Sequence, residues 1–260
     1  MTRPDRGGAL VTGGAKRVGR ALCLALGEAG YAVAIHHRGD EDAARALAAE
    51  IEARDGRAAP LHADLSDIAE TRGLVARAAE AAGPLTLLVN NASHFGDDTL
   101  QTMTPESWAE HMGPNLFGPV LLCQSFAKAA GTLPEGADPC IVNILDQRVL
   151  RPNPQFFSYT LAKSALYTAT QTMAQALAPR IRVNGVGPGP TLPSIHQSQA
   201  VFDAEVAGTL LQRRTELSDI TGAVLYLAGA RAVTGQMIAV DNAQHLGWKT
   251  PDIIAPDAPE

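Results

Sequence analysis

The sequence predicts an α/β fold in which one doubly wound parallel sheet of about seven strands carries helices on both faces. Short apolar runs alternate with longer amphipathic runs along nearly the whole chain. The short runs are wholly apolar, which is typical of strands buried on both faces of a parallel sheet. Neither a Ser- or Gly-rich linker nor an internal repeat divides the 260 residues. We therefore expect a single domain over residues 1–260.

Each short apolar run is assigned to a strand and each amphipathic run to a helix. The expected strands cover residues 9–11, 32–35, 59–62, 85–89, 141–145, 181–186 and 237–240. The expected helices lie near residues 18–29, 40–55, 68–81, 105–130, 156–177 and 219–228. Gly30 and Gly56 end the first two helices, as C-terminal glycines commonly do. The core then covers about 8–247, and repeated prolines predict an irregular tail over 248–260.

Composition and charge exclude several classes of protein. With 46% hydrophobic and 18% charged residues, the chain is not intrinsically disordered. The 21 basic and 27 acidic residues give a net charge of −6, which argues against a nucleic-acid partner. The start of the chain lacks the pattern of a signal peptide, and no stretch is apolar enough to span a membrane, so a cytoplasmic location is expected. The cysteines and histidines show no metal-ligand spacing, and we expect no metal site.

A glycine-rich segment, Thr12–Gly19, lies between the first strand and the first helix. Glycine allows the backbone to turn sharply and approach a pyrophosphate, while the helix N-terminus offers N–H groups and partial positive charge. The strand–turn–helix context therefore favours a Rossmann-like dinucleotide site, with a structural turn that binds no ligand as the alternative.

The end of the second strand indicates which dinucleotide binds. It reads His36-His37-Arg38-Gly39, without the acidic residue that would bind the ribose of NAD. Lys16 in the glycine segment is expected nearby, so Lys16 and Arg38 together favour the 2′-phosphate of NADPH. Asp40 argues against this reading, but its position suits an N-cap of the following helix.

These residues also resemble the short-chain dehydrogenases/reductases, over about residues 8–247. The landmarks are the glycine segment, Asp64-Leu65, Asn90-Asn91-Ala92, Asn115, Tyr159-x-x-x-Lys163 and Pro188-Gly189. Three positions depart from the usual pattern. Arg17 replaces a glycine, Ser93 replaces the glycine after Asn-Asn-Ala, and Asp146 replaces the serine thirteen residues before the tyrosine. The same three changes occur together in the pteridine reductases of this family, including bacterial dihydromonapterin reductases.

Tyr159 and Lys163 are four residues apart and share one helix face. A neighbouring ammonium would lower the tyrosine pKa toward the working range, although this spacing also arises by chance. Asp146 follows an apolar strand at the expected ligand-binding edge. Burial would raise its pKa and let it donate a proton, and a turn cap is the alternative. By resemblance, Tyr159 and Lys163 assist reduction of a full pterin, and Asp146 serves the step from dihydropterin to tetrahydropterin.

The resemblance implies roles for further residues. Asn115 supports a proton relay and Phe95 stacks on the pterin, with a plain interior amide and an exposed loop aromatic as the alternatives. Asp64 faces the adenine, unless it caps the next helix. The residues implied in cofactor binding are Gly13, Lys16, Arg17, Val18, Gly19, His37, Arg38, Gly39, Asp64, Leu65, Asn91, Ala92, Ser93, Tyr159, Lys163, Pro188 and Gly189. Those implied in substrate binding are Arg17, Ser93, Phe95, Asp146 and Tyr159.

We therefore expect an NADPH-dependent reductase, catalysing with Asp146, Tyr159, Lys163 and Asn115, that acts on dihydromonapterin, dihydrobiopterin or dihydrofolate-like rings. A carbonyl reductase or alcohol dehydrogenase of the same family remains an alternative, with Asp146 a local variation. A non-catalytic NADP(H)-binding sensor or scaffold is a second. The resemblance alone implies a homotetramer.

Overall fold

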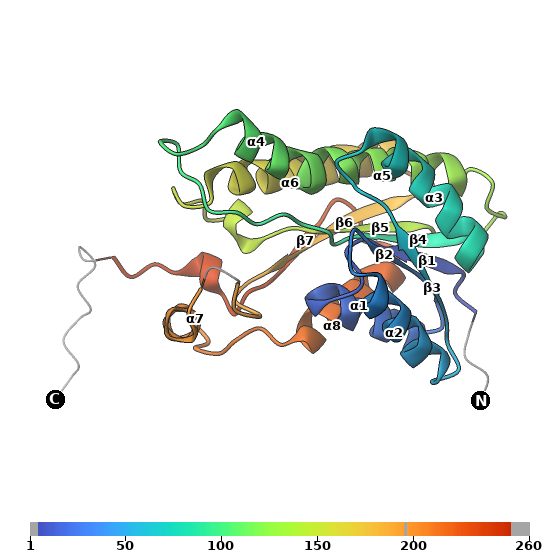
Figure 1. Ribbon diagram of the computed structural model, residues 1–260, viewed down its shortest axis with the longest axis horizontal. Helices are drawn as coiled ribbons and strands as arrows, with labels where there is room; N and C mark the ends of the chain where they lie inside the picture. The colour runs from blue at the N-terminus through green and yellow to red at the C-terminus, as the bar shows by residue number, and fades with distance from the viewer. Residues whose placement is uncertain (1–4, 195–196, 251–260) are drawn as a thin grey trace.

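The fold is a seven-stranded parallel sheet flanked by helices on both faces (Figure 1). The computed structural model describes residues 5–194 and 197–250. The strand order is β3-β2-β1-β4-β5-β6-β7, and each neighbouring pair is parallel. The predicted fold class is therefore confirmed. The expected tail lies largely outside the described residues, which end at residue 250.

Strands and main helices alternate along the chain until the last third. The strands are β1 (Gly8–Val11), β2 (Ala32–His37), β3 (Arg57–His62), β4 (Leu85–Asn90), β5 (Cys140–Ile144), β6 (Arg182–Pro188) and β7 (Met237–Val240). The α-helices are α1 (Arg17–Glu28), α2 (Glu41–Glu52), α3 (Ile68–Ala82), α4 (Pro105–Met112), α5 (Gly118–Ala130), α6 (Phe157–Leu177), α7 (Gln199–Ala207) and α8 (Leu217–Gly229). Short 3₁₀ turns cover Gln147–Val149 and Gln244–Leu246.

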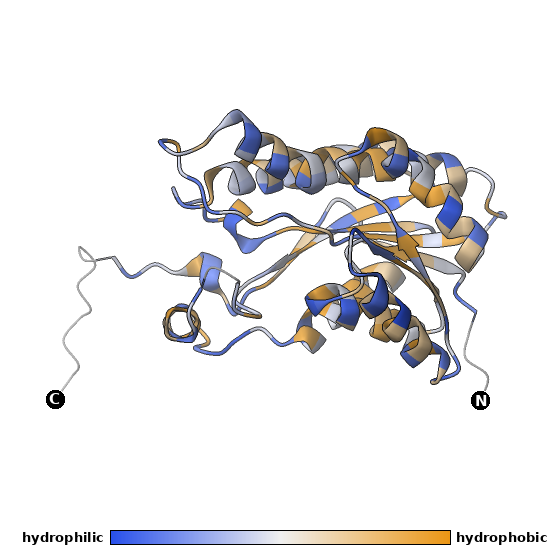
Figure 2. Ribbon diagram, viewed as in Figure 1, coloured by the Kyte–Doolittle hydropathy of each residue, from blue (hydrophilic) through white to orange (hydrophobic). Residues whose placement is uncertain are grey.

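Two hydrophobic layers form the core, one on each face of the sheet. Successive strand residues point to opposite faces, so Ala9 and Val11 of β1 join one layer while Leu10 joins the other. The first layer packs α1, α2 and α8 against the sheet, and the second packs α3 and α5. Figure 1 shows these two groups of helices on opposite sides. Apolar and polar residues alternate along the same helices in Figure 2, as expected for helices with one buried side.

One expected helix is interrupted. The run over residues 105–130 contains α4, a π-helical turn at Gly113–Phe117 and then α5. Pro114 lacks an N–H group and disturbs the regular hydrogen-bond ladder, and Gly113 adds backbone freedom. The wider turn places the Asn115 side chain in the interior, where it is completely buried. Helix α7 was not expected, since its only fully buried residue is Phe202 and its apolar periodicity is weak.

The order of the strands determines where a ligand can bind. The chain leaves β1 through α1 to β2 on one side, while β4 pairs with β1 on the other. Helices from these two connections lie on opposite faces, which opens a crevice at the carboxyl ends of β1 and β4. The glycine segment follows β1 and Asn91 follows β4, so both predicted landmarks meet there.

Candidate active site

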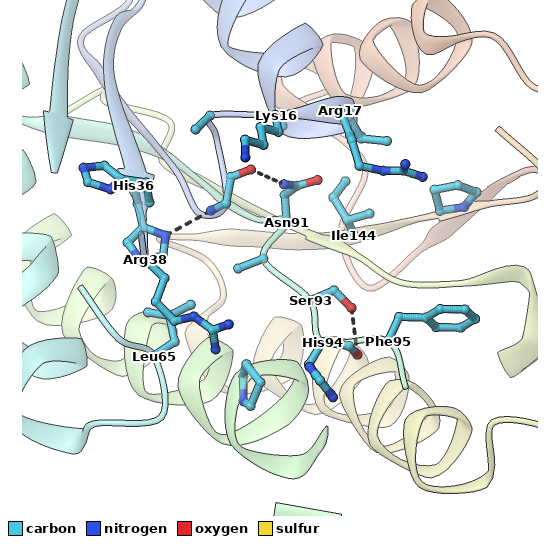
Figure 3. A pocket seen from close by; sticks show the side chains of 18 of the residues that line it. Lys16, Arg17, His36, Arg38, Leu65, Asn91, Ser93, His94, Phe95 and Ile144 are labelled. Atoms are coloured by element: carbon cyan, nitrogen blue, oxygen red, sulfur yellow. Dashed lines mark hydrogen bonds between the residues drawn. The ribbon is translucent and has the colours of Figure 1, made fainter. Parts of the chain in front are cut away.

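A cavity of about 500 Å³ lies at the carboxyl edge of the sheet, within the range of small-molecule and cofactor sites. Figure 3 shows side chains that line it. Every residue predicted for cofactor binding, substrate binding or catalysis lines it, except Gly39 and Asn115. Gly39 is an exposed turn residue, and a Cβ atom there would contact nothing within 4 Å. The cavity is also lined by residues to which the sequence assigned no binding or catalytic role: Ala15, His36, Asp40, His94, Pro114, Ile144 and Leu145.

The glycine segment is fixed against the end of β4. Thr12 Oγ1 accepts hydrogen bonds from the backbone N–H groups of Asn91 and Ala92, both at 2.9 Å. Asn91 Nδ2 donates to the carbonyl oxygens of Thr12 at 2.9 Å and Gly13 at 3.1 Å. Gly13 has a φ of +60°, and a Cβ atom there would lie 2.9 Å from Ala92 Cα. A side chain at position 13 is therefore excluded, which keeps the backbone open to a ligand.

Arg17 occupies the position where the usual motif has glycine, and its φ of 52° is left-handed. Its guanidinium donates to the carbonyl oxygens of Leu192 at 3.2 Å and Pro193 at 3.1 Å. These residues belong to the segment that follows β6. Arg17 therefore links the glycine loop to the chain that passes beside the cavity, while its side chain still lines it.

Three basic or polar residues gather where the sequence predicts a 2′-phosphate. Lys16 and Arg38 are exposed at the cavity, and the His37 side chain is buried with Nδ1 lacking a hydrogen-bond partner. The expectation that Asp40 caps α2 through its side chain is wrong. Asp40 occupies the N-cap position, but its carboxylate forms an ion pair with Lys16 instead of a capping hydrogen bond. The nearby ammonium competes for the carboxylate more strongly than a neutral backbone N–H group does.

The segment after β3 contradicts the alternative interpretation of Asp64 as the cap of the next helix. Asp64 lines the cavity and its Oδ1 accepts the Ser66 N–H at 2.8 Å, so it stabilises a turn. Asp67, not Asp64, caps α3, accepting from the N–H groups of Ala69 and Glu70. Gly189, which follows β6, also lines the cavity, and a Cβ atom there would lie 2.6 Å from the Asp241 Cα, so glycine is needed for this close approach.

Asp146 and Tyr159 form a hydrogen-bonded pair at the end of β5. The Tyr159 hydroxyl donates to Asp146 Oδ2 at 2.8 Å, and Asp146 Oδ1 accepts the Arg148 N–H at 2.8 Å. Asp146 therefore also caps the short 3₁₀ turn, as the alternative reading proposed. Burial raises the pKa of Asp146, although the Arg148 N–H, the Tyr159 hydroxyl and nearby positive charges oppose this. This carboxyl group can hold a proton at a higher pH than an ordinary aspartate.

The expected lowering of the tyrosine pKa is wrong for this structure. Burial and the adjacent Asp146 carboxylate raise the pKa of Tyr159 well above its usual value. Lys163 Nζ donates to the Ile144 carbonyl at 2.8 Å, and burial lowers the pKa of this ammonium to about 8. Because the lysine charge is itself weakened and faces Asp146 as well, it does not make the phenolate favourable. Tyr159 is therefore a protonated hydrogen-bond donor at neutral pH.

Asn115 does not reach the cavity surface but shapes its wall. Its Oδ1 accepts from Ser93 Oγ and from the His94 N–H, both at 2.9 Å, and its Nδ2 donates to the His94 carbonyl at 2.8 Å. Both polar atoms of the amide thus hold the segment that carries Ser93 and His94. A plain interior amide is not the right description, since this turn lines the cavity.

Phe95 and the start of α6 form an aromatic wall beside the pair. Phe95 stacks on Phe156 with ring centroids 4.2 Å apart, and it meets Tyr159 edge-to-face at 4.8 Å. The reading of Phe95 as an exposed loop aromatic without a partner is therefore wrong. An aromatic plane next to a proton donor suits a flat heteroaromatic ligand.

None of the described helices is long and apolar enough to cross a membrane. Within residues 5–194 and 197–250, no group of three or more His, Cys, Asp or Glu side chains could hold a metal ion.

Comparison with known proteins agrees with this geometry. The family model of the short chain dehydrogenases matches residues 8–202. One similar structure is the crystal structure of FolM alternative dihydrofolate reductase 1 from Brucella canis complexed with NADP. Its sequence is 48% identical, the match covers 95% of this chain and 97% of that chain, and the TM-score is 0.91. Pteridine reductase 1 of Leishmania tarentolae is 33% identical and covers 94% of this chain and 98% of its own. The 3-oxoacyl-[acyl-carrier-protein] reductase FabG of Staphylococcus epidermidis is 30% identical, covering 92% and 98%. This chain belongs to the short-chain dehydrogenase family.

Proposed function

We propose that this protein is an NADPH-dependent reductase of dihydropterins, including dihydromonapterin, dihydrobiopterin and dihydrofolate-like rings. The observation that carries the proposal is the hydrogen-bonded pair of Asp146 and Tyr159 at the cavity wall, with the aromatic ring of Phe95 beside it. The similarity to proteins described as an alternative dihydrofolate reductase and a pteridine reductase supports it.

The cavity residues fit a phosphorylated dinucleotide. The open cradle at Gly13 suits close approach of a pyrophosphate, and the N-terminus of α1 adds partial positive charge. Lys16 and Arg38 supply charge for a 2′-phosphate, and the unpartnered Nδ1 of His37 is a further polar group at this end. Lys163 is buried at the cavity and carries N–H groups suited to ribose hydroxyls. The solved Brucella relative contains NADP.

The acid pair suits reduction of a C=N bond. NADPH, when bound, would supply a hydride for the carbon, and the nitrogen would need a proton from a nearby acid. Asp146, with its raised pKa, is suited to donate that proton in the step from dihydropterin to tetrahydropterin, and the Tyr159 hydroxyl would stabilise the remaining carboxylate through its hydrogen bond to Asp146 Oδ2. A serine hydroxyl at position 146 would orient a carbonyl but would be a poor acid. Asn115 contributes by holding the Ser93–His94 turn.

Steady-state assays of NADPH oxidation with dihydropterins and with ketones test this function. We expect turnover of at least one dihydropterin. Turnover of ketones alone would transfer the assignment to a carbonyl reductase, and unchanged turnover in Tyr159→Phe would remove the reaction from this site. Tyr167→Phe is the matched control on the same helix, since Tyr167 does not line the cavity.

The proton-donor role has its own test. Asp146→Ala should reduce the rate with dihydropterin by about 10²-fold or more, the usual contribution of a positioned acid, and leave NADPH binding within about twofold. An equal loss of turnover and NADPH binding would contradict that role. The homotetramer implied by the resemblance and the cytoplasmic location predicted from the sequence belong to the same proposal, and light scattering on the purified protein tests the tetramer.

A further inference from the structure

His36 lies between two segments at the cavity, the glycine loop and the chain after β3. The sequence assigned it no role in binding or catalysis. It is the penultimate residue of β2 and only 2% exposed. The Gly13 N–H donates to His36 Nδ1 at 2.9 Å, and His36 Nε2 lies 3.0 Å from the Ala63 carbonyl oxygen. The His36 backbone carbonyl also accepts the Gly14 N–H at 2.8 Å. One residue thus contacts the glycine loop twice and the segment after β3 once.

These partners determine the protonation state of the ring. Gly13 offers a donor, so Nδ1 must be an unprotonated acceptor. The Ala63 carbonyl is an acceptor, so Nε2 must carry the hydrogen. Burial is the main cause that lowers the pKa of His36 to about 4; the Ala63 carbonyl opposes the shift, and the charges of His37, His62 and Arg77 add to it. The ring is therefore neutral at physiological pH. Protonation at Nδ1 would place its N–H group against the Gly13 N–H group, and the hydrogen bond between them would be lost.

Each wall that His36 holds faces the same end of the cavity. Gly13 begins the loop expected to face the pyrophosphate, and Ala63 directly precedes Asp64 and Leu65, which line the cavity. The far side of the glycine loop is held by Asn91. Between these two anchors the loop has little freedom, and its spacing from the Ala63–Leu65 segment is determined by one imidazole ring.

We propose that His36 is a positioning residue for the dinucleotide, acting as a neutral Nε2–H imidazole that holds the glycine loop and the Ala63–Leu65 segment at a fixed spacing. The proposal rests on the NADPH-binding function proposed above. It predicts that losing the ring's two hydrogen bonds weakens cofactor binding while leaving the chemical step intact, because Asp146 and Tyr159 are attached to β5 and α6.

Three substitutions distinguish the contributions of the two His36 side-chain hydrogen bonds, one to Gly13 and one to Ala63. His36→Leu removes both hydrogen bonds, His36→Asn places an amide near Nδ1 to accept from Gly13, and His36→Gln places one near Nε2 to donate to Ala63. We expect His36→Leu to raise the Kd of NADPH, measured by fluorescence titration, by about tenfold or more, which corresponds to ~1.4 kcal/mol. The single-bond variants should lie between Leu and wild type. The kcat at saturating NADPH should stay within about twofold.

The matched control is His62→Leu, since His62 is an exposed histidine at the same edge of the sheet and does not line the cavity. Its Kd should match wild type. An unchanged Kd in His36→Leu, or a fall in kcat without a change in Kd, would overturn the positioning role. If wild type bound no NADPH, the proposed function itself would fail instead.

Long-range ¹H–¹⁵N NMR of the imidazole tests the proposal without any substitution, even if His36→Leu does not fold. The Nε2–H tautomer should persist at about pH 6, above the lowered pKa of this ring. A protonated ring or an Nδ1–H tautomer at that pH would contradict the proposed role.

Discussion

Asp98 holds the first turn of α6, the helix that carries Tyr159 and Lys163. The N-cap residue of this helix is Phe156, which has a left-handed backbone and offers no capping oxygen. Asp98 supplies one from a distant loop: its Oδ1 accepts the Ser158 N–H at 2.9 Å, and its backbone carbonyl accepts the Phe157 N–H at 3.0 Å. Only 3% of Asp98 is exposed. Asp98→Ala would leave the buried Ser158 N–H group, next to Tyr159, without a partner.

The expected loss of stability follows from these contacts. A buried hydrogen bond to a charged group contributes about 1.5–3 kcal/mol, and a carboxylate at a helix N-terminus adds about 0.3–1 kcal/mol through the helix dipole. We therefore expect Asp98→Ala to lower the free energy of unfolding by about 2–4 kcal/mol. Asp98→Asn keeps an acceptor and should lower it by about 1 kcal/mol. Guanidinium unfolding, followed by circular dichroism and fluorescence together, measures both values.

The same substitution should slow the reaction. A misplacement of about 1 Å in a reacting group can reduce a rate by about 10²-fold, and Ser158 directly precedes Tyr159. We expect kcat to fall by about tenfold or more in Asp98→Ala and by less in Asp98→Asn. Asp97→Ala is the matched control, because Asp97 is the exposed neighbour. If Asp98→Ala unfolded within about 0.5 kcal/mol of wild type with unchanged kcat, the capping role would be refuted.

Acid should remove this contribution. Burial raises the pKa of Asp98, but its hydrogen bonds to Ser158 and the His111 charge outweigh burial, and the net pKa lies below the usual 3.8. A lowered carboxyl pKa stabilises the fold above the unfolded value, and that stabilisation is lost as the pH falls through the folded value. The difference in stability between wild type and Asp98→Asn should therefore shrink below about pH 4.

Three further predictions concern the acid pair, the phosphate end and the core. With dihydropterin, kcat should fall as the pH rises through the raised pKa of Asp146, because the donor must begin protonated, and Asp146→Asn should remove this limb of the pH profile. Arg38→Ala should raise the Kd of NADPH by about tenfold or more and leave that of NADH unchanged; equal effects on both would exclude a 2′-phosphate contact. Arg182 donates to Asp138 and to three carbonyl oxygens at the end of α8. Arg182→Met should therefore lower the free energy of unfolding by about 3–5 kcal/mol, measured by guanidinium unfolding. A loss below about 1 kcal/mol would contradict this.

The strands could be predicted because parallel strands buried on both faces leave continuous apolar runs in the sequence. The interruption of the helix over residues 105–130 could not, because a π-turn at Gly113–Phe117 depends on the environment that receives Asn115. Helix α7 buries so little that its sequence pattern does not separate it from a loop. In both cases the structure depends on contacts with distant parts of the chain, which a local sequence pattern does not contain.

Some features of the site could likewise be predicted from the sequence, and others could not. Residues of recognised motifs, such as Gly13 and Tyr159, line the cavity as the sequence indicates. The direction of the Tyr159 pKa was wrong, since the spacing to Lys163 gives no sign that Asp146 accepts the tyrosine hydrogen. The contacts of His36 and Asp98 join segments 23 to 60 residues apart, which no local pattern records. A polar residue near the end of an otherwise apolar strand was the available signal for His36.

In the proposed enzyme, His36 would affect cofactor binding and Asp98 would affect the reaction rate, through separate contacts. His36 acts between the glycine loop and the segment after β3, whereas Asp98 acts on the first turn of α6, and their hydrogen-bond partners are different residues. Substitutions at independent sites usually have additive free energies. The loss of cofactor affinity from His36 and the loss of rate from Asp98 should therefore combine without interaction. Because neither side chain takes part in the chemistry itself, each end of the site can vary while the Asp146–Tyr159 pair stays unchanged.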